Sequence, residues 1–175
     1  MKIHTLTLTA LFAALLCIIS PWAVPVGPIP ISLATFGIYL ISAVGGWRSG
    51  TLAVIVYLLI GTVGAPVFAG FRGGAQTILG PTGGYLMGYI VCALCVGDAS
   101  DRFDGRRPAC LIGMIVGTIL LYALGTIWYM SQTSSALEPA LLLCVLPFLP
   151  GDAVKIAAAC VLAPLLRRRL YATKK

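Results

Sequence analysis

The sequence predicts an all-α, polytopic membrane protein with six transmembrane helices and both termini in the cytoplasm. Three observations lead to this fold class: an apolar composition, apolar stretches of membrane-spanning length, and basic residues in every second break between them. Hydrophobic residues make up 59% of the 175 residues, charged residues make up 10%, and mean hydropathy is +1.01. A soluble domain of this length needs more polar surface to cover itself. We therefore expect the chain to lie in a bilayer.

Apolar stretches separated by polar or Gly- and Pro-rich breaks define the expected spans. A span needs roughly 17 to 25 mostly apolar residues, so this chain has room for about six spans with short loops and no added soluble domain. The predicted spans are residues 5–20, 31–47, 50–65, 83–97, 109–130 and 140–166.

Lysine and arginine are concentrated in the breaks after the second, fourth and sixth spans. The other breaks carry only Arg72 and Glu138 as charged residues. Cytoplasmic loops hold the excess of basic residues, so both termini are expected inside and the Pro- and Gly-rich breaks outside. This distribution also accounts for the net charge of +7 without nucleic acid as a partner. The basic residues concerned are Arg48, Arg102, Arg106, Arg107, Arg167, Arg168, Arg169, Lys174 and Lys175.

Small residues and cysteines within the spans indicate packing more than chemistry. Cys92 and Cys95 form a CxxC without a nearby histidine or second pair, so we expect no metal site and no cofactor. Small residues four positions apart let two helices approach closely in lipid. Packing within the chain is the ordinary interpretation of each such pair, and docking of another subunit is the alternative. The pairs are Ala10 and Ala14, Gly84 and Gly88, and Gly113 and Gly117.

Asp152 and Lys155 are the charged residues expected at membrane depth. Such groups cost several kcal/mol unless they are paired or face a polar cavity, and their i,i+3 spacing places them on one helix face. Pro147 and Pro150 interrupt the span, so we expect a new helix to begin near Gly151, with Asp152 in its first turn. The pair either contacts a ligand or merely caps and neutralises the helix.

The outer break 66–76, with residues 80–85, is the second candidate binding region. Its many glycines favour a tightly folded loop whose backbone can approach a ligand. Arg72 is the one basic residue expected outside, and Gln76 offers both donors and acceptors. The loop could cover a site whose floor is the charged pair. It lacks the Gly-Lys-Ser/Thr ending of a Walker A motif, so nucleotide binding is not expected.

An enzyme is not expected, because His4 is the one histidine and no catalytic triad or paired carboxylates are visible. Two hypotheses remain. The chain is a solute-binding transport component, or it is a non-transport scaffold subunit in which Asp152 and Lys155 form a structural ion pair.

The motifs at these positions resemble the BioY family, the biotin-binding substrate-specificity (S) components of energy-coupling factor (ECF) transporters. The specific stretches are GPTGGY at 80–85 and LPFLPGDxxK at 146–155, and two weaker ones are GPIPISL at 27–33, followed by Thr35-Phe36-Gly37, and GAPVFAG at 64–70. Together they extend over nearly the whole chain. Members often carry glutamine where this chain has Ala34, so the polar contact of that glutamine is either absent here or provided by Gln76.

The resemblance implies that residues 1–175 form a single six-helix transmembrane substrate-binding domain. Such a domain, in a bacterial cytoplasmic membrane and in contact with its lipid, binds biotin with high affinity near the outer face. It delivers biotin inward with a transmembrane coupling subunit and two cytoplasmic ATPase subunits. Ala10 and Ala14 resemble the AxxxA-type feature by which such components dock on coupling helices.

The resemblance also suggests roles for the site residues. Biotin joins a polar ureido ring to an apolar ring and chain that end in a carboxylate, so its site should mix a few polar groups with apolar walls. Asp152 is expected to accept a ureido N–H, and Lys155 and Arg72 to supply positive charge or donors. The expected wall residues are Tyr85, Phe36 and Phe68.

Overall fold

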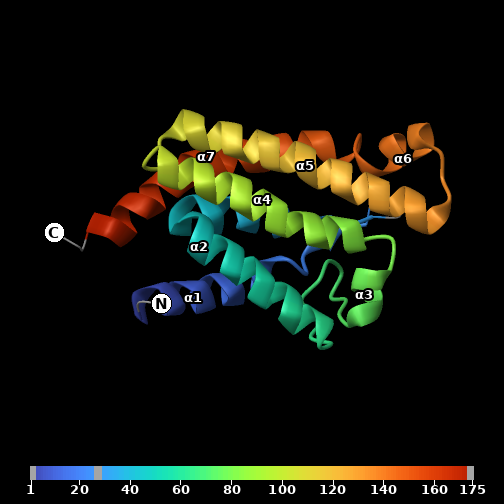
Figure 1. Ribbon diagram of the computed structural model, residues 1–175, viewed down its shortest axis with the longest axis horizontal. Helices are drawn as coiled ribbons and strands as arrows, with labels where there is room; N and C mark the ends of the chain where they lie inside the picture. Colours follow the sequence, from blue (N-terminus) through green and yellow to red (C-terminus); the bar gives the residue numbers. More distant parts are fainter. Residues whose placement is uncertain (1–2, 26–28, 173–175) are drawn as a thin grey trace.

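The computed structural model describes residues 3–25 and 29–172 of the chain. The long helices run side by side along the longest axis of the molecule (Figure 1). Two short strands, β1 (Ala23–Val24) and β2 (Ile31–Ser32), pair antiparallel between α1 and α2. The helices are α1 (Ile3–Ile19), α2 (Ala34–Thr62), α3 (Ala75–Leu79), α4 (Gly83–Arg102), α5 (Arg107–Thr133), α6 (Leu137–Cys144) and α7 (Phe148–Ala172).

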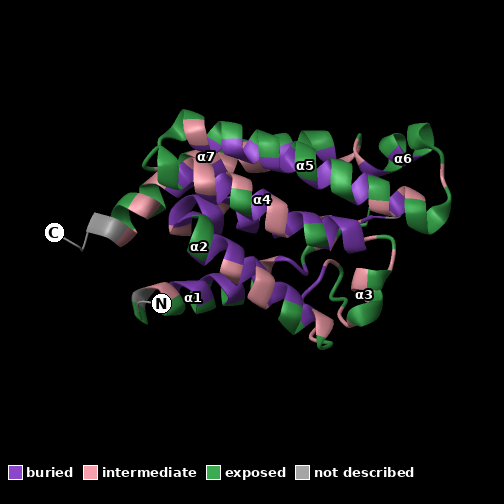
Figure 2. Cartoon of the chain, in the orientation of Figure 1, coloured by how far each residue is buried: buried purple, intermediate pink, exposed green. Residues whose placement is uncertain are grey.

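Among the described residues, α2, α4, α5 and α7 are long and apolar enough to cross a membrane, and α1 contains a shorter apolar stretch. The helices are buried where they face one another and exposed on their outer sides (Figure 2). The exposed side of α5 carries Ile112, Ile119 and Ile127, each at least 60% exposed. Large aliphatic side chains on an outer face are suited to lipid, so the predicted all-α, polytopic membrane fold is confirmed.

The predicted spans 31–47 and 50–65 form one helical element, α2, with a sharp turn at Gly46. Gly46 has φ 73° and ψ −178°, a conformation that favours glycine. A Cβ placed on Gly50 would lie 2.7 Å from the Cα of Ser42. Residues eight apart in a straight helix are about 12 Å apart, so the two halves of α2 fold back on each other. The turn comes before Arg48, and no separate loop joins the halves.

Two of the three small-residue pairs bring α4 and α5 together. Gly84 and Gly88 face α5, and Gly113 and Gly117 face α4. A Cβ on Gly117 would lie 3.1 Å from the sulfur of Cys92, so these backbones are already in close contact. Packing within the chain is therefore the correct interpretation for both glycine pairs.

The predicted last span, 140–166, is divided into α6 and α7, and the break lies earlier than expected. α7 begins at Phe148, because Pro147 cannot continue α6 while Pro150 fits in the first turn of a new helix. Asp152 therefore lies in the second turn. The prediction of a helix start near Gly151 was wrong, and Asp152 does not cap the helix.

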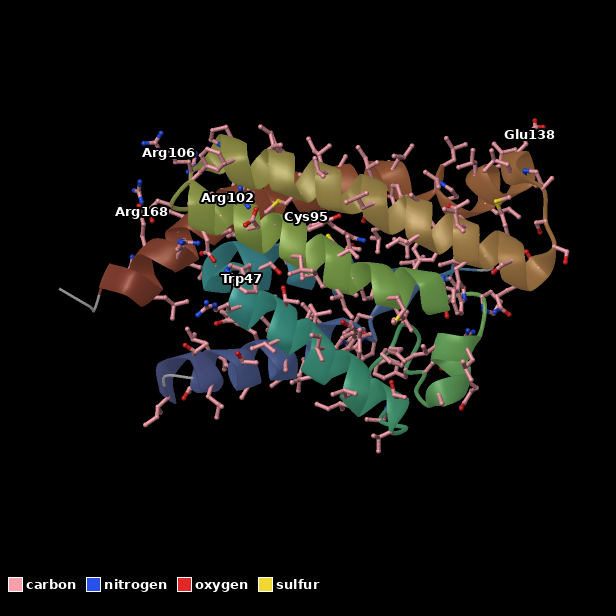
Figure 3. The ribbon with its side chains drawn as sticks, viewed as in Figure 1. Trp47, Cys95, Arg102, Arg106, Glu138 and Arg168 are labelled. Atoms are coloured by element: carbon pink, nitrogen blue, oxygen red, sulfur yellow. The ribbon has the colours of Figure 1, made fainter. Side chains whose placement is uncertain are left out.

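The basic residues gather at one end of the molecule. Arg102, Arg106 and Arg168 lie at the end where both chain termini are found, and Glu138 lies at the opposite end (Figures 1 and 3). The predicted placement of the basic breaks on one side is confirmed. We call these the basic end and the α3–α6 end.

Candidate functional site

Asp152 and Lys155 form a buried ion pair on α7, toward the α3–α6 end. The Lys155 Nζ lies 2.9 Å from Asp152 Oδ1, and the two side chains are 11% and 4% exposed. Charges so far from water persist only when other polar groups complete their hydrogen bonding. The neighbouring elements supply those groups.

Three further residues from β2, α2 and α5 complete the network around the pair. Thr35 donates a hydrogen bond to Asp152 Oδ1 (3.1 Å), and the Tyr122 hydroxyl donates to Oδ2 (2.7 Å). The Lys155 ammonium donates to the carbonyl of Ser32 (2.7 Å) and to Thr35 Oγ1 (3.1 Å). All three ammonium protons thus have acceptors, and both carboxylate oxygens have donors.

This network forms one side of a hollow of about 30 Å³ that adjoins a second hollow of about 40 Å³. The first is lined by the charged network with Leu121 and Phe148, and the second by Phe68 and Arg72 among others. The wall common to both hollows is apolar and aromatic. It consists of Ile29, Pro30, Tyr85 and Tyr89.

Tyr85 is the predicted wall residue at the junction of the two hollows. Its hydroxyl donates to the carbonyl of Cys144 (2.8 Å), and its ring stacks on Phe148 with centroids 6.2 Å apart. Phe68 is also fixed as wall, because it is 1% exposed and packs edge-on against Tyr57 at 5.6 Å. The surroundings of both rings leave them little freedom.

The glycine-rich loop folds back tightly, as predicted. Phe68 and Arg72 exchange two backbone hydrogen bonds, and Gly70 (φ 72°) lies between them. The Gly70 N–H donates to the carbonyl of Pro21 (2.9 Å), and the rings of Trp22 and Phe71 meet edge-on at 5.8 Å. The glycine-rich loop therefore contacts the segment that follows α1.

Gln76 and Phe36 are not brought into the hollows. The Gln76 amide donates to the carbonyl of Gly73 (3.1 Å) on the exposed outer side of the loop. Phe36 follows Thr35 on α2, and successive helical side chains point about 100° apart. Because Thr35 points at Asp152, Phe36 is turned aside and packs half-buried against the core.

Sequence reasoning missed Tyr122, Tyr89 and Ser32, and gave Thr35 no role of its own. Tyr122 lies in the middle of an apolar stretch, where its one signal is a hydroxyl that needs a partner when buried. Ser32 contributes its backbone carbonyl, which no side-chain pattern reveals.

The third small-residue pair differs from the glycine pairs. Ala10 and Ala14 are both exposed on α1, so neither is used to pack α1 against the rest of the described chain. In the described ranges, no group of three His, Cys, Asp or Glu residues could hold a metal ion.

Comparison with known proteins agrees with the resemblance read from the motifs. A model of the BioY family matches residues 1–172. "Biotin transporter BioY2" of Lactococcus lactis is 33% identical over 174 residues, which cover 99% of this chain and 96% of that protein. "Biotin transporter BioY" of Thermotoga maritima is 35% identical, over 90% of this chain and 92% of that protein.

A solved structure shares the fold. It is the crystal structure of the S-component for biotin from an ECF-type ABC transporter, with a TM-score of 0.88 and 30% sequence identity. The match covers 95% of this chain and 92% of that chain. The chain belongs to the BioY family.

Proposed function

We propose that this protein is the biotin-binding S component of an ECF-type ABC transporter and takes part in biotin uptake. The observation that carries the proposal is the buried Asp152 and Lys155 network beside an aromatic wall, in a chain whose family match extends over residues 1–172. Family membership favours transport over the scaffold hypothesis. In this function the protein is a substrate-binding component and not an enzyme.

The distribution of polar groups suits biotin. The Asp152 carboxylate accepts a ureido N–H, and Lys155 supplies a nearby positive charge. Tyr85, with Phe68, contacts the apolar ring and chain. Arg72, at the far hollow, supplies a second positive charge. Two of the three donors to the carboxylate bind Oδ1 and one binds Oδ2, so Oδ2 keeps an acceptor site for the ureido N–H.

Biotin enters from the α3–α6 end, which we assign to the outer face. Sites for ligands of drug size enclose roughly 300–1,000 Å³, far more than the two hollows provide. The contacts of Gly70 with Pro21 and of Phe71 with Trp22 therefore open during binding.

The topology has six spans within a single domain, residues 1–175, of a bacterial cytoplasmic membrane. The spans are α1, the two halves of α2, α4, α5, and α6 with α7. The gathering of arginines at the basic end supports cytoplasmic termini. A transmembrane coupling subunit docks on the face of α1 that carries Ala10 and Ala14, and two cytoplasmic ATPase subunits supply the energy.

Calorimetry of biotin binding to the detergent-purified protein tests the function. We expect tight binding by the parent and a loss of about tenfold or more in Asp152→Asn and Lys155→Ala, because each removes a buried charged hydrogen bond. Glu138→Gln is the control, since Glu138 is an exposed charged residue that lines neither hollow. The proposal is wrong if the folded parent does not bind biotin, or if the two site variants bind as tightly as the control.

Replacement of Ala10 and Ala14 by leucine tests the docking face. Larger side chains prevent close helix approach, so we expect co-purification with the coupling subunit to fall severalfold while biotin binding is kept. Ala123→Leu, at an exposed alanine of α5, is the control. Unchanged co-purification of the double variant would contradict docking at this face.

A further inference from the structure

A large cavity at the basic end is separate from the biotin site. It has a volume of about 790 Å³ and lies where the turn between α4 and α5 meets the last part of α7. Arg106 and Arg168 extend from the molecule in this region (Figure 3). The four arginines that line the cavity are Arg106, Arg107, Arg167 and Arg168.

The fold holds one wall of this cavity in place. Asp104 (φ 49°) and Gly105 (φ 69°) form the turn, and a Cβ on Gly105 would lie 2.7 Å from Arg167 Cδ. Arg167 is anchored in turn, because its guanidinium donates to the carbonyl of Ala43 (3.2 Å) and to Ser100, and pairs with an acidic residue of α4. The turn therefore rests on a fixed side chain of α7.

The other three arginines bring positive charge that nearby carboxylates do not neutralise. Within the described part of the chain, the side chains of Arg106, Arg107 and Arg168 have no hydrogen bond or ion pair, and Asp104 is the one acidic residue lining the cavity. The first turn of α5 also contains no acidic residue. The site therefore favours a ligand with concentrated negative charge, such as a phosphate group.

Apolar surface adjoins the arginines on the side that faces lipid. Leu165 lines the cavity, and Leu111, Ile112 and Leu162 are exposed next to it along α5 and α7. These two helices pack together much less than α4 and α5 do, and their exposed apolar side chains are left uncovered by the described chain and open to acyl chains. A free anion would contact only the arginines. A phospholipid would contact the arginines with its headgroup and the apolar side chains with its acyl chains.

We propose that this cavity is a binding site for the headgroup of an anionic phospholipid, with the acyl chains along α5 and α7. Basic pockets between membrane helices on the cytoplasmic side suit such headgroups. The bound lipid ties the turn between α4 and α5 to the end of α7. The proposal depends on the arginines and the adjoining exposed apolar side chains, and it is independent of biotin binding.

The test compares lipid binding to the delipidated, detergent-purified full chain. Phosphatidylglycerol and phosphatidylcholine with the same acyl chains are titrated, and bound lipid is counted by native mass spectrometry alongside the melting temperature. We expect the parent to prefer phosphatidylglycerol by about tenfold or more. Arg106→Gln with Arg168→Gln should remove most of that preference.

Arg102→Gln is the matched control, because Arg102 lies at the same end but lines no part of the cavity and pairs with Asp98. It should keep the preference. If the double variant does not fold, Arg168→Gln alone is used, since Arg168 is exposed.

Three outcomes would overturn the proposal. One is an equal loss of preference in the Arg102 control. Another is displacement of phosphatidylglycerol by millimolar inorganic phosphate, which would indicate a site for a free anion. The third is a double variant that keeps its lipid preference but loses the ATPase subunits, which would indicate an acidic protein partner.

Discussion

The two ends of the molecule each contain an acid–base pair, but in different surroundings. Asp152 and Lys155 are 2.9 Å apart, with side chains 4% and 11% exposed. Asp101 and Arg167, at the basic end, are 3.3 Å apart with side chains 39% and 17% exposed. Water can solvate the second pair when it opens, whereas the first has no such replacement. Because Asp152 and Lys155 are buried, removing the charge of either residue leaves the other without a counter-ion.

The backbone differs between the ends as well. The α3–α6 end contains two short strands and two short helices, so its backbone bends around the hollows. At the basic end the backbone turns tightly at Gly46 and Gly105, and the helical segments on either side of each turn are long and regular. Irregular backbone at membrane depth is tolerated where protein buries it or where it lines a cavity, so the two ends are suited to different tasks.

The largest expected effect comes from Lys155→Met, which keeps the side-chain bulk and removes the charge. It leaves the Asp152 carboxylate buried without its cation, so we expect a loss of roughly 3–5 kcal/mol in unfolding free energy. Unfolding by denaturing detergent, monitored by circular dichroism, measures this loss.

The double variant Asp152→Asn with Lys155→Met is the control for that measurement. Removing both charges leaves no unpaired ion, so it should be more stable than Lys155→Met alone. If the double variant is the less stable of the two, the pair is not the source of the effect.

A smaller effect is expected for Tyr122→Phe, which removes one hydrogen bond to the carboxylate. Bonds to charged groups contribute about 1.5–3 kcal/mol, so the loss of unfolding free energy should fall in that range. Tyr39→Phe is a matched control, because Tyr39 is also buried but shares its 2.6 Å hydrogen bond with the neutral hydroxyl of Thr118. We expect it to cost about 0.5–1.5 kcal/mol. Equal losses would mean that the carboxylate at Asp152 gives Tyr122 no special role.

The smallest effect is expected at the basic end, from Asp101→Asn. Asp101 accepts the backbone N–H of Trp47 (3.0 Å) next to the α2 turn and pairs with Arg167, but its side chain is 39% exposed. Asparagine keeps an acceptor, so we expect a loss of about 1 kcal/mol or less that shrinks further at high salt.

Asp98→Asn provides the reference for that variant. Its pair with Arg102 is 2.7 Å long, but the arginine side chain is 71% exposed, so its removal should cost less than about 0.5 kcal/mol. A loss at Asp101 as large as that at Lys155 would contradict the comparison of the two ends.

The predicted elements were accurate where a long apolar stretch decides the structure. Spans 83–97 and 109–130 lie inside α4 and α5, and the glycine pairs pack as expected. The errors lie at breaks. The turn within α2 falls at Gly46 because it requires a positive φ (73°), which glycine adopts without steric cost. The last helix, α7, begins at Phe148 because Pro150 is compatible with a first helical turn.

The candidate site was predicted in part for a similar reason. Asp152 and Lys155 are neighbours on one helix, so their spacing alone places them together. Gln76 and Phe36 were chosen from residue type, yet their directions depend on how the outer loop folds and how α2 is rotated.

The sequence by itself determined that the chain belongs in a membrane, that its basic residues gather at one end, and that Asp152 and Lys155 share a helix face. Composition and local periodicity carry that information, because each depends on residues close together in the chain. Only the tertiary structure decided that Thr35, Tyr122 and the Ser32 carbonyl complete the charged network. Those partners come from segments 30 to 123 residues away from the pair, and helix rotation and packing, which no local pattern encodes, bring them together.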